Sequence, residues 1–538
     1  MSDTPTTTVD VLVVGGGLGG LSTTMNLARW GVSVLMVEKH PTTSVQPRAI
    51  GQNPRTMELL DVAGVADEVR RAGAAGGEQD HFTTRVVESV RGTVLGVFRE
   101  SFDDLVTATA PCAPQPWALA FQDQIEPIML ARATELGAQT AFRTELVSYE
   151  QDVDGVTAVL SDRVSGERRQ VRARYLVAAD GDHSRIREGL GIPRHGLGVL
   201  SNVVSCIFEA DLAEILPPEA SGLYYLRNPQ FSGVFIGSVR PQRHTFLVEY
   251  HPERGESPED FPPQRFVKLL RIALDAPDLE PRILDVQRWE MAALVAERWR
   301  SGRVFLVGDA AKVTPPTGGL GGNTAIGDGY DLAWKLAAVV SGQAGTGLLD
   351  AYEPERRHVA QLVVDEALGL YADRLAPHLT DQLPRPIGYA RVILGFRYRS
   401  GAVLEESAAV DDADTEDPQQ PSGRPGFRAP HLWVYRDGTR ISTVGLFGNG
   451  WTVITGADGH KWVEAAQHVA TDLGVALPAY RVGADVTGAD DDVHAAYGIG
   501  TTGASLIRPD GVVAWRTDTT PDDPHTVLRS VLARVLSR

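Results

Sequence analysis

The chain has 538 residues, 43% of them apolar, so it can bury a large core and should contain two or three domains. Its 51 Lys and Arg residues against 69 Asp and Glu residues give a net charge of −18, which argues against nucleic acid or an anionic membrane as the main partner. Two cysteines are too few for a disulfide framework or a four-thiolate metal site, and we expect a cytoplasmic protein with no metal centre. No run of about 20 apolar residues predicts a membrane span.

The N-terminal segment predicts a dinucleotide-binding unit. Residues 9–14 are typical of a buried parallel strand, and a glycine cluster leads from them into an apolar helix over 21–30. Three of these glycines fit a fingerprint that allows a tight turn, close approach of a pyrophosphate, and close packing of helix on strand. A second strand, 32–37, ends on Glu38, where an acid that binds an adenosine ribose belongs. The three glycines are Gly15, Gly17 and Gly20.

A polar loop follows Glu38 where a plain dehydrogenase would continue with another strand and helix. Arg48 in this loop could reach a phosphate or a flavin, or it could be an ordinary surface charge. Residues 56–72 predict one amphipathic helix. Gln122 opens a further helix to about residue 136, and its amide could bind a ribityl chain or merely start the helix.

Two further strands each end in Asp-Gly or Gly-Asp. The strand over 170–179 runs into Asp180, which could bind the ribityl or pyrophosphate region, although an Asp-Gly turn needs no ligand. The strand over 303–307 runs into Asp309, whose carboxylate could accept hydrogen bonds from ribityl hydroxyls.

A proline- and glycine-rich loop follows Asp309, and a helix is predicted over 323–341. The glycines of the loop would let bare backbone lie against a flat ring, and the helix N-terminus would stabilise an anion. This combination favours a flavin, whereas the alternative is a turn between strand and helix that binds nothing.

Two segments outside these motifs predict a sheet-based domain. Residues 81–99 and 195–282 show the alternation of β-strands, and aromatic residues concentrate in the second. A sheet with one aromatic face suits a flat hydrophobic substrate, so we expect substrate contacts here, although most aromatics could equally be core. The expected substrate contacts are Tyr224, Phe235 and Tyr250.

The C-terminal part predicts a linker and a small domain. Residues 401–430 are rich in Asp, Glu, Pro and Gly, which favours a linker. Strands and helices then alternate in a thioredoxin-like order over 431–538. Neither Cys112 nor Cys206 lies in that domain, which excludes dithiol chemistry there.

The glycine fingerprint with its acid, Asp180-Gly181, and Gly308-Asp309 with its loop resemble, in chain order, the group A flavoprotein aromatic hydroxylases of the p-hydroxybenzoate hydroxylase fold. The stretches 49–60, 309–319 and 394–400 are similar to the aromatic polyketide hydroxylases within that family. The resemblance covers essentially the whole chain. It implies an α/β (α+β overall) protein in which a Rossmann-like FAD-binding domain is interleaved with a β-sheet substrate domain and followed by a thioredoxin-like domain.

The implied domains interleave along the chain. They are an FAD-binding domain in three parts (1–76, 111–187 and 285–400, the last with additional helices), a substrate domain in two parts (77–110 and 188–284), a linker (401–430) and a thioredoxin-like domain without a CxxC motif (431–538).

The resemblance also implies non-covalent FAD, NADPH as reductant and O₂ as co-substrate. A second glycine fingerprint is missing, in agreement with a family that has no dedicated nicotinamide domain. Relatives vary in the stretch 320–323, but the backbone of this stretch would still be able to contact the flavin. The residues that inherit FAD contacts by position are Gly15, Gly17, Leu18, Gly20, Glu38, Lys39, Arg48, Gln122, Asp180, Asp309, Pro316, Gly319, Gly321, Gly322 and Asn323.

The implied reaction is hydroxylation of a phenolic ring of an anthracycline-type (tetracyclic) polyketide through a flavin C4a-hydroperoxide. Tyr225 and Arg374 are the candidates for orienting and polarising the phenol, since arginine offers a fixed charge to a phenolate and tyrosine a proton relay. Their alternative roles are core packing and a solvated helix charge.

Rival functions are Baeyer–Villiger or epoxidising oxygenation on the same fold, catabolic hydroxylation of a one-ring phenol, and a non-catalytic flavoprotein that sequesters a polyketide. We expect a small-molecule partner and a monomer or homodimer.

Overall fold

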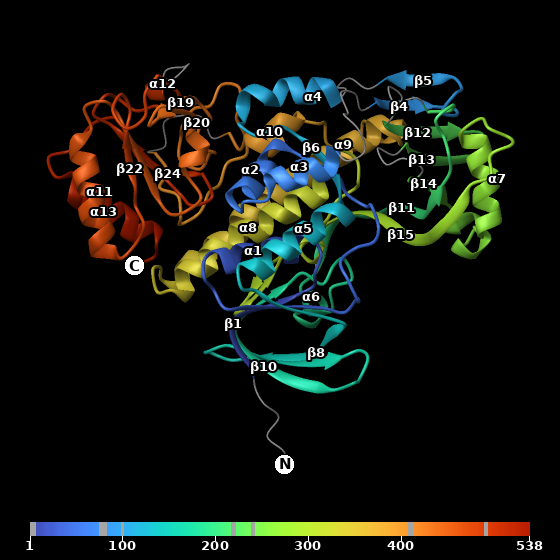
Figure 1. Ribbon diagram of the computed structural model, residues 1–538, viewed down its shortest axis with the longest axis horizontal. Helices are drawn as coiled ribbons and strands as arrows, with labels where there is room; N and C mark the ends of the chain where they lie inside the picture. The colour runs from blue at the N-terminus through green and yellow to red at the C-terminus, as the bar shows by residue number, and fades with distance from the viewer. Residues whose placement is uncertain are drawn as a thin grey trace, which may run out of the picture.

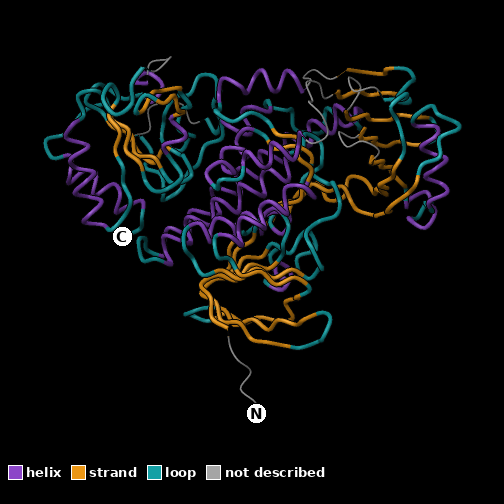
Figure 2. The backbone as a smooth tube through the Cα atoms, in the orientation of Figure 1, coloured by secondary structure: helices purple, strands orange, loops and turns teal. Residues whose placement is uncertain are grey.

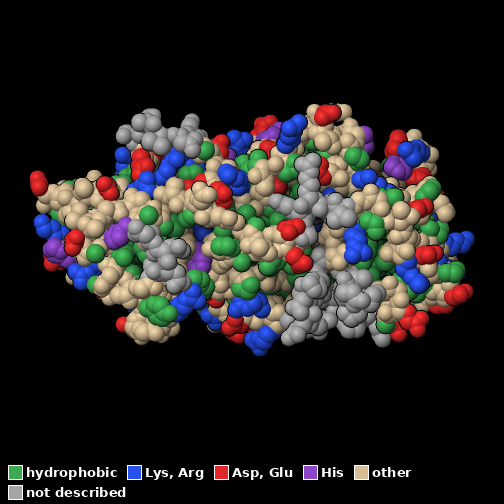
Figure 3. Space-filling model, turned by 90° about the horizontal axis from the view of Figure 1, so that it is seen from above, with side chains coloured by type: hydrophobic (Ala, Val, Ile, Leu, Met, Phe, Trp, Pro, Cys, Tyr) green, Lys and Arg blue, Asp and Glu red, His purple; other side chains and the backbone are tan. Residues whose placement is uncertain are grey.

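The computed structural model describes residues 7–74, 83–97, 102–216, 222–237, 243–406, 413–488 and 493–538. A central block of helices lies above one sheet, a second sheet lies to one side, and the C-terminal domain lies to the other (Figures 1 and 2). Acidic and basic side chains are interspersed on the face seen from above (Figure 3). Within the described ranges, no helix combines the length and the apolar character that crossing a membrane requires.

The first sheet has the order β16-β17-β10-β1-β2-β7, and β8 and β9 extend it beside β10. Strands β1, β2, β10 and β17 are parallel, so their carboxyl ends meet at one edge. This edge gathers Gly15, Glu38, Asp180 and Asp309. The strands are β1 (Thr7–Val14), β2 (Val34–Glu38), β7 (Gln139–Phe142), β8 (Thr144–Gln151), β9 (Val156–Asp162), β10 (Arg168–Ala178), β16 (Arg300–Ser301) and β17 (Val304–Leu306).

The helices of the central block cover that sheet. The longest are α8 and α9, and α8 packs against α1 (Figure 1). A short two-stranded ribbon, β3 with β6, joins the loop after β2 to the start of α5. These elements are α1 (Leu18–Arg29), β3 (Ile50–Gln52), α2 (Pro54–Val62), α3 (Ala66–Ala74), α4 (Phe102–Thr109), β6 (Ala118–Phe121), α5 (Gln122–Glu135), α6 (Arg185–Gly189), α8 (Leu320–Val340), α9 (Tyr352–Arg374) and α10 (Tyr389–Leu394).

The second sheet has the order β18-β15-β11-β14-β13-β12-β4-β5, and helix α7 covers one of its faces. A separate hydrophobic core fills the space between this face and α7. The elements are β4 (Thr83–Val87), β5 (Val94–Val97), β11 (Arg194–Glu209), β12 (Gly222–Asn228), β13 (Phe231–Gly237), β14 (Arg243–Tyr250), α7 (Pro263–Ala273), β15 (Arg282–Ala296) and β18 (Lys312–Val313).

The C-terminal domain has the sheet order β22-β21-β23-β24, a βαβ unit followed by a hairpin and a terminal helix. It docks on the central block, where Trp451 packs edge-on against Trp334 of α8. The elements are β19 (Trp433–Arg436), β20 (Thr439–Ser442), β21 (Thr452–Thr455), α11 (His460–Leu473), β22 (Ala479–Arg481), α12 (Val493–Tyr497), β23 (Ala504–Ile507), β24 (Val513–Thr517) and α13 (Pro524–Val535). The predicted fold class is therefore confirmed.

Several local predictions were wrong. The helix expected over 56–72 is two helices, because the chain breaks between α2 and α3 at Gly64, which has a φ of +82°. Helix α8 begins at Leu320 rather than at Asn323, because Gly319 serves as its N-cap.

The segment predicted to be a linker, 401–430, is largely packed against the rest of the protein. Its residues 407–412 lie outside the described ranges, but residues 425–430 are buried and Thr415 bridges Phe396. The strand signal over 81–99 resolves into β4 and β5, and residues 81–82 and 98–99 of it are not described.

Candidate active site

The turn between β1 and α1 has the geometry that an anion-binding glycine turn requires. Gly15 has a φ of +112°, and a Cβ there would lie 2.1 Å from the carbonyl oxygen of Ala179. A Cβ on Gly20 would lie 2.0 Å from the carbonyl oxygen of Gly15, so the helix packs on the turn only because both residues lack side chains. Gly17 is the N-cap of α1, and no side chain caps that helix, whose first N–H groups are therefore left for an anion.

Glu38 lies beside this turn. Its Oε2 accepts a hydrogen bond from the Gly16 amide at 2.6 Å, and its Oε1 accepts one from the His40 amide at 2.8 Å. The carboxylate is thus held at the carboxyl end of β2, in the position predicted for binding a ribose, whereas the next residue, Lys39, is exposed.

A buried carboxylate that the sequence analysis did not identify lies near the turn. Glu126 is 1% exposed and accepts hydrogen bonds from the Ser44 amide at 2.7 Å and from Gln122 Nε2 at 2.6 Å. Burial raises the pKa of Glu126. The predicted Gln122 amide is thus engaged with a residue one helical turn later, a spacing of four that could have been noticed in the sequence.

Asp180 has a local structural role. Ser184 Oγ donates to its Oδ1 at 2.6 Å, and the Ile186 amide donates to its Oδ2 at 3.3 Å, so the carboxylate holds the start of α6. Burial raises the pKa of Asp180. Its predicted contact with a ribityl or pyrophosphate group stays a prediction.

Asp309 follows β17 in a single 3₁₀ turn. The surrounding protein raises the pKa of Asp309, yet its side chain is exposed, so the carboxylate lies deep among protein atoms but remains reachable. The preceding residue, Gly308, is fixed because its amide donates to Asp328 Oδ2 at 3.2 Å. This is a suitable place for an acceptor of ribityl hydroxyls.

The glycine-rich loop lies against the first glycine turn. Gly319 has a φ of +64° and is the N-cap of α8, again without a side-chain cap. A Cβ on Gly322 would lie 2.9 Å from Leu18 Cδ1 and 3.1 Å from Ala49 Cβ. Pro316 and Gly319 are exposed, and Gly321 is half-buried. Two uncapped helix N-termini therefore belong to adjoining glycine loops, which fits a ligand with anionic groups and a flat ring.

Asn323 braces this loop. Its Oδ1 accepts from the Asn53 amide at 3.0 Å, and its Nδ2 donates to the carbonyl oxygens of Gly319 at 2.8 Å and Gly51 at 3.1 Å. The side chain is buried, so we assign it to holding the loop, and any contact with a flavin would come from backbone.

Arg48 lies where the FAD-binding part meets the second sheet. Its Nη2 donates to Gln287 Oε1 on β15 at 2.9 Å, and the guanidinium is exposed. Nearby, Gln46 is hydrogen-bonded to Asp285 of the same strand. The loop after Glu38 thus bridges the two sheets with an available positive charge.

The two faces of the second sheet have different environments. Tyr224 pairs with Phe235, and Phe235 with Phe246, so these rings form a row on the face that packs on α7. Tyr224 is 1% and Phe235 is 0% exposed, and Tyr250 packs at 6.2 Å from Phe261 on the same side. We therefore propose a packing role for these three residues in place of the predicted substrate contact.

The opposite face carries the row Tyr225, Val234 and Leu247. Val234 and Leu247 are half-buried, whereas their neighbours on the α7 side are buried. Arg374, the last residue of α9, reaches this face, and its Nη1 lies 3.4 Å from the Tyr225 hydroxyl. The structure thus brings the two predicted catalytic residues together on the face that α7 does not cover, where Tyr225 itself is 3% exposed.

A set of buried charges that was not predicted from the sequence lies next to the Gly308–Asp309 turn. Asp328 is 0% exposed and accepts from Lys312 Nζ at 2.8 Å and from Arg356 Nε at 2.9 Å. Only five lysines occur in the chain, and Lys312 and Lys335 are both buried in ion pairs. The signal available in the sequence was two aspartates and a lysine, Asp328, Asp331 and Lys335, within the mainly apolar helix α8.

Comparison with known proteins gives two family matches. Residues 8–367 match the FAD binding domain family, and residues 422–538 match the C-terminal domain of aromatic-ring hydroxylases.

Individual relatives cover the whole chain. Aklavinone 12-hydroxylase RdmE of Streptomyces purpurascens is 56% identical over 98% of this chain and 99% of its own, and 4-methyl-5-nitrocatechol 5-monooxygenase of a Burkholderia species is 39% identical over 99% and 98%. A crystal structure of aklavinone-11 hydroxylase with FAD and aklavinone has a TM-score of 0.95 at 56% identity, with 100% of both chains covered. The predicted resemblance to the group A flavoprotein aromatic hydroxylases, and within them to the aromatic polyketide hydroxylases, is confirmed.

Proposed function

Because this chain belongs to the FAD-dependent aromatic-ring hydroxylases, we propose that it hydroxylates a phenolic ring of an anthracycline-type aromatic polyketide, with NADPH as reductant and O₂ as co-substrate. The observation that carries the proposal is the superposition, at a TM-score of 0.95 over the full length, on a hydroxylase crystallised with FAD and aklavinone. The arrangement of the two glycine loops, Glu38 and Asp309 at one sheet edge supports it independently.

The proposed FAD contacts divide by chemistry. The N–H groups that begin α1 and α8 would hold the pyrophosphate and the ring system, Glu38 would hold the adenosine ribose, and Asp309 the ribityl chain. When bound, FAD supplies the activation of O₂ and the oxygen transfer, while the protein contributes binding, orientation and electrostatics.

The proposed substrate surface is the half-buried row beside Tyr225. Its aliphatic members suit the flat face of a polycyclic ring. The Arg374 guanidinium, near the Tyr225 hydroxyl, would favour ionisation of a phenol placed there, and Tyr225 would hold or pass the proton at its hydroxyl oxygen. Ionisation of the phenol makes the ring carbons ortho and para to it more nucleophilic.

The test is consumption of NADPH by the purified yellow protein with and without aklavinone, followed by mass and NMR analysis of the product. We expect strong stimulation, a gain of one oxygen and an intact ring skeleton. The names of the relatives place the new hydroxyl on carbon 11 in one case and on carbon 12 in another, so NMR of the product must determine its position here. No stimulation and no product would contradict the proposal.

The same assay separates the rivals. A lactone or ring-opened product would indicate Baeyer–Villiger chemistry, and an epoxide would indicate epoxidation. Tight binding without turnover would indicate a sequestering flavoprotein. The second candidate function is hydroxylation of a one-ring phenol, which the 39% identity to a nitrocatechol monooxygenase favours. A panel of one-ring phenols as substrates tests it. We further propose a cytoplasmic monomer or homodimer, which fractionation and light scattering would test.

A further inference from the structure

The C-terminal domain inserts one arginine between two helices of the central block. Arg508, in the turn between β23 and β24, is 0% exposed. Its Nη1 and Nη2 donate to the two carboxylate oxygens of Glu355 at 2.5 and 2.8 Å, and its Nη2 donates to Asp510 at 2.6 Å. The guanidinium also lies over the rings of Trp334 on α8, at 5.1 Å, and Tyr398, at 5.2 Å.

This arginine completes a buried charge cluster. Lys335 Nζ binds Asp331 at 2.5 Å and Glu355 at 2.8 Å, so two cations face three carboxylates in a region that is 0 to 4% exposed. Because the two cations already lie between the carboxylates, the acids form an ion-pair network rather than a metal site. Without Arg508, one lysine would face three buried carboxylates, which is costly.

The cluster connects to the Gly308–Asp309 turn of the proposed FAD site through a continuous set of contacts. Tyr398, whose ring lies under Arg508, accepts a hydrogen bond at its hydroxyl from Arg356 Nη1 at 2.8 Å. Arg356 in turn donates to Asp328 at 2.9 Å, and Asp328 accepts from the Gly308 amide at 3.2 Å. Gly308 directly precedes Asp309.

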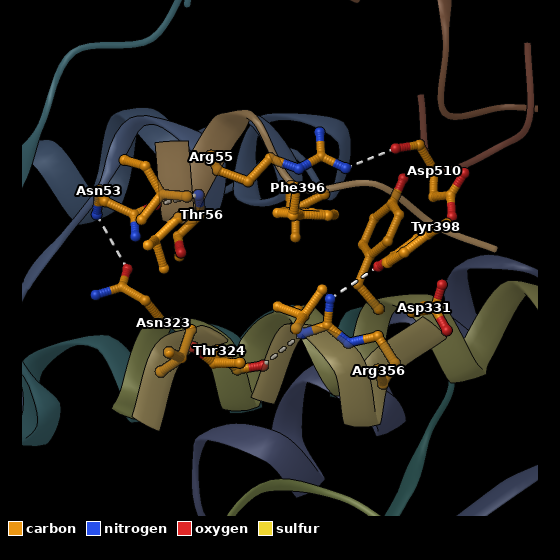
Figure 4. Close-up of a pocket in the computed structure, with 17 residues that line it drawn as sticks. Asn53, Arg55, Thr56, Asn323, Thr324, Asp331, Arg356, Phe396, Tyr398 and Asp510 are labelled. Carbon is orange, nitrogen blue, oxygen red and sulfur yellow. Dashed lines mark hydrogen bonds between the residues drawn. The ribbon is translucent and has the colours of Figure 1, made fainter. Parts of the chain in front are cut away.

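Figure 4 shows where these groups lie relative to the loop. Arg356, Tyr398, Asp331 and Asp510 surround one side of a cavity of about 50 Å³, and Asn323 lies on the other side. Arg356 also donates to the carbonyl oxygen of Thr324 in the first turn and a half of α8 at 3.3 Å. The same guanidinium therefore contacts groups that fix both Gly308 and the start of the helix behind the glycine-rich loop.

We propose that Arg508 is a positioning residue of the flavin site: acting through Tyr398, Arg356 and Asp328, it fixes the Gly308–Asp309 turn and the N-terminal part of α8. The C-terminal domain, which contributes none of the predicted FAD contacts, thereby sets the affinity and the reduction potential of the bound flavin. The inference rests on the FAD site described above and is independent of the substrate.

Two substitutions test it. Arg508→Lys keeps the charge but loses the bidentate, stacked geometry, and Tyr398→Phe keeps the ring but removes the acceptor for Arg356. The matched control is Tyr497→Phe, since Tyr497 is also 0% exposed and its hydroxyl donates to a backbone carbonyl within the C-terminal part, that of Pro430 at 3.0 Å. Each holoenzyme is measured for its FAD dissociation constant, its flavin midpoint potential and its Tm, without substrate.

Both test variants should weaken FAD binding by about 2-fold to 30-fold, and both should shift the midpoint potential. The control should lower Tm while both flavin readouts stay at wild-type values. Either test variant with wild-type affinity and potential overturns the proposal, whatever its Tm. If Arg508→Lys does not accumulate, Tyr398→Phe decides alone. Failure of the FAD assignment itself would appear in the wild-type titration.

Discussion

Arg428 and Glu58, 370 residues apart in the chain, form a bidentate ion pair that attaches the segment before the C-terminal domain to helix α2. The pair is buried, with side chains 7% and 2% exposed, and Arg428 also donates to the carbonyl oxygen of Cys112 at 3.0 Å. Arg55, on the same helix, donates to Glu58 at 3.0 Å and is hydrogen-bonded to the backbone of Asp510. The segment predicted to be a linker is therefore a fixed part of the domain junction.

Breaking this pair should destabilise the protein strongly. Glu58→Gln leaves the buried Arg428 guanidinium without its carboxylate, and we expect a loss of about 3–5 kcal/mol in the free energy of unfolding. Arg428→Met leaves Glu58 with Arg55 as its remaining cation, so its loss should be smaller. Urea denaturation followed by circular dichroism measures it. In the double variant Glu58→Gln with Arg428→Met, neither charge of the Arg428–Glu58 pair is left unpaired, so the loss should be smaller than the sum of the two single losses. Additive losses would show that the pair does not couple.

The glycine turn makes a prediction about cofactor binding. In Gly15→Ala, the new Cβ would lie 2.1 Å from a carbonyl oxygen at a φ of +112°, so the turn must move. We expect FAD affinity to fall by at least about tenfold, as measured by fluorescence titration. Gly31→Ala is the control, because that residue has a φ of +74° with open space around it, and it should cost about 1 kcal/mol of stability without changing FAD affinity.

Much of the geometry of the candidate FAD site was predictable because parallel strands place their carboxyl ends at one edge. Gly15, Glu38 and Asp309 each lie at or just after the end of a short, mainly apolar strand, a signal local enough to read without the fold. Glu126 was missed because it lies in the middle of α5, where nothing local marks it as buried.

The proposed substrate face was not predictable by the same means. Alternation shows that a strand has two faces but not which one a helix covers. The aromatic row around Tyr224 was taken for the ligand face, whereas α7 covers that row and the neighbouring residue, Tyr225, faces the other way. The role of Arg508 carried no local signal, because Glu355, which it binds through both Nη atoms, lies on α9, 153 positions away.

The charge cluster at Arg508 predicts a specific pH dependence of stability. Burial is the main cause that raises the pKa of Asp331 from 3.8 to about 7, and Glu355 and Asp510 add to it while Lys335 and Arg508 oppose it. At a pH between these two pKa values, Asp331 is protonated more often in the folded protein than in the unfolded chain. The contribution of Asp331 to stability therefore falls as the pH rises from about 4 to 7, by at most about 1.4 kcal/mol per pH unit.

Asp331→Asn removes that titration. When the pH is raised from 5.5 to 7.5, the wild type should therefore lose unfolding free energy relative to the variant. Glu355, whose pKa is lowered to about 2, is ionised in both states over this window, and the buried histidines His244 and His431 titrate alike in both proteins. Parallel pH profiles for the two proteins would show that Asp331 does not titrate in this range.

The pair on the open face of the second sheet makes the prediction that bears directly on turnover. Tyr225→Phe removes the hydroxyl that lies 3.4 Å from Arg374, and Arg374→Met removes the fixed charge that would favour a phenolate. We expect kcat with aklavinone to fall on the order of 10²-fold in each variant, while FAD affinity stays unchanged. Raising the pH should restore part of the activity of Arg374→Met, because the phenol then ionises without assistance.

The matched control is Tyr224→Phe, on the neighbouring residue that faces α7, which should keep wild-type kcat even if its Tm falls. Equal losses in Tyr224→Phe and Tyr225→Phe would mean that the two faces have been assigned wrongly.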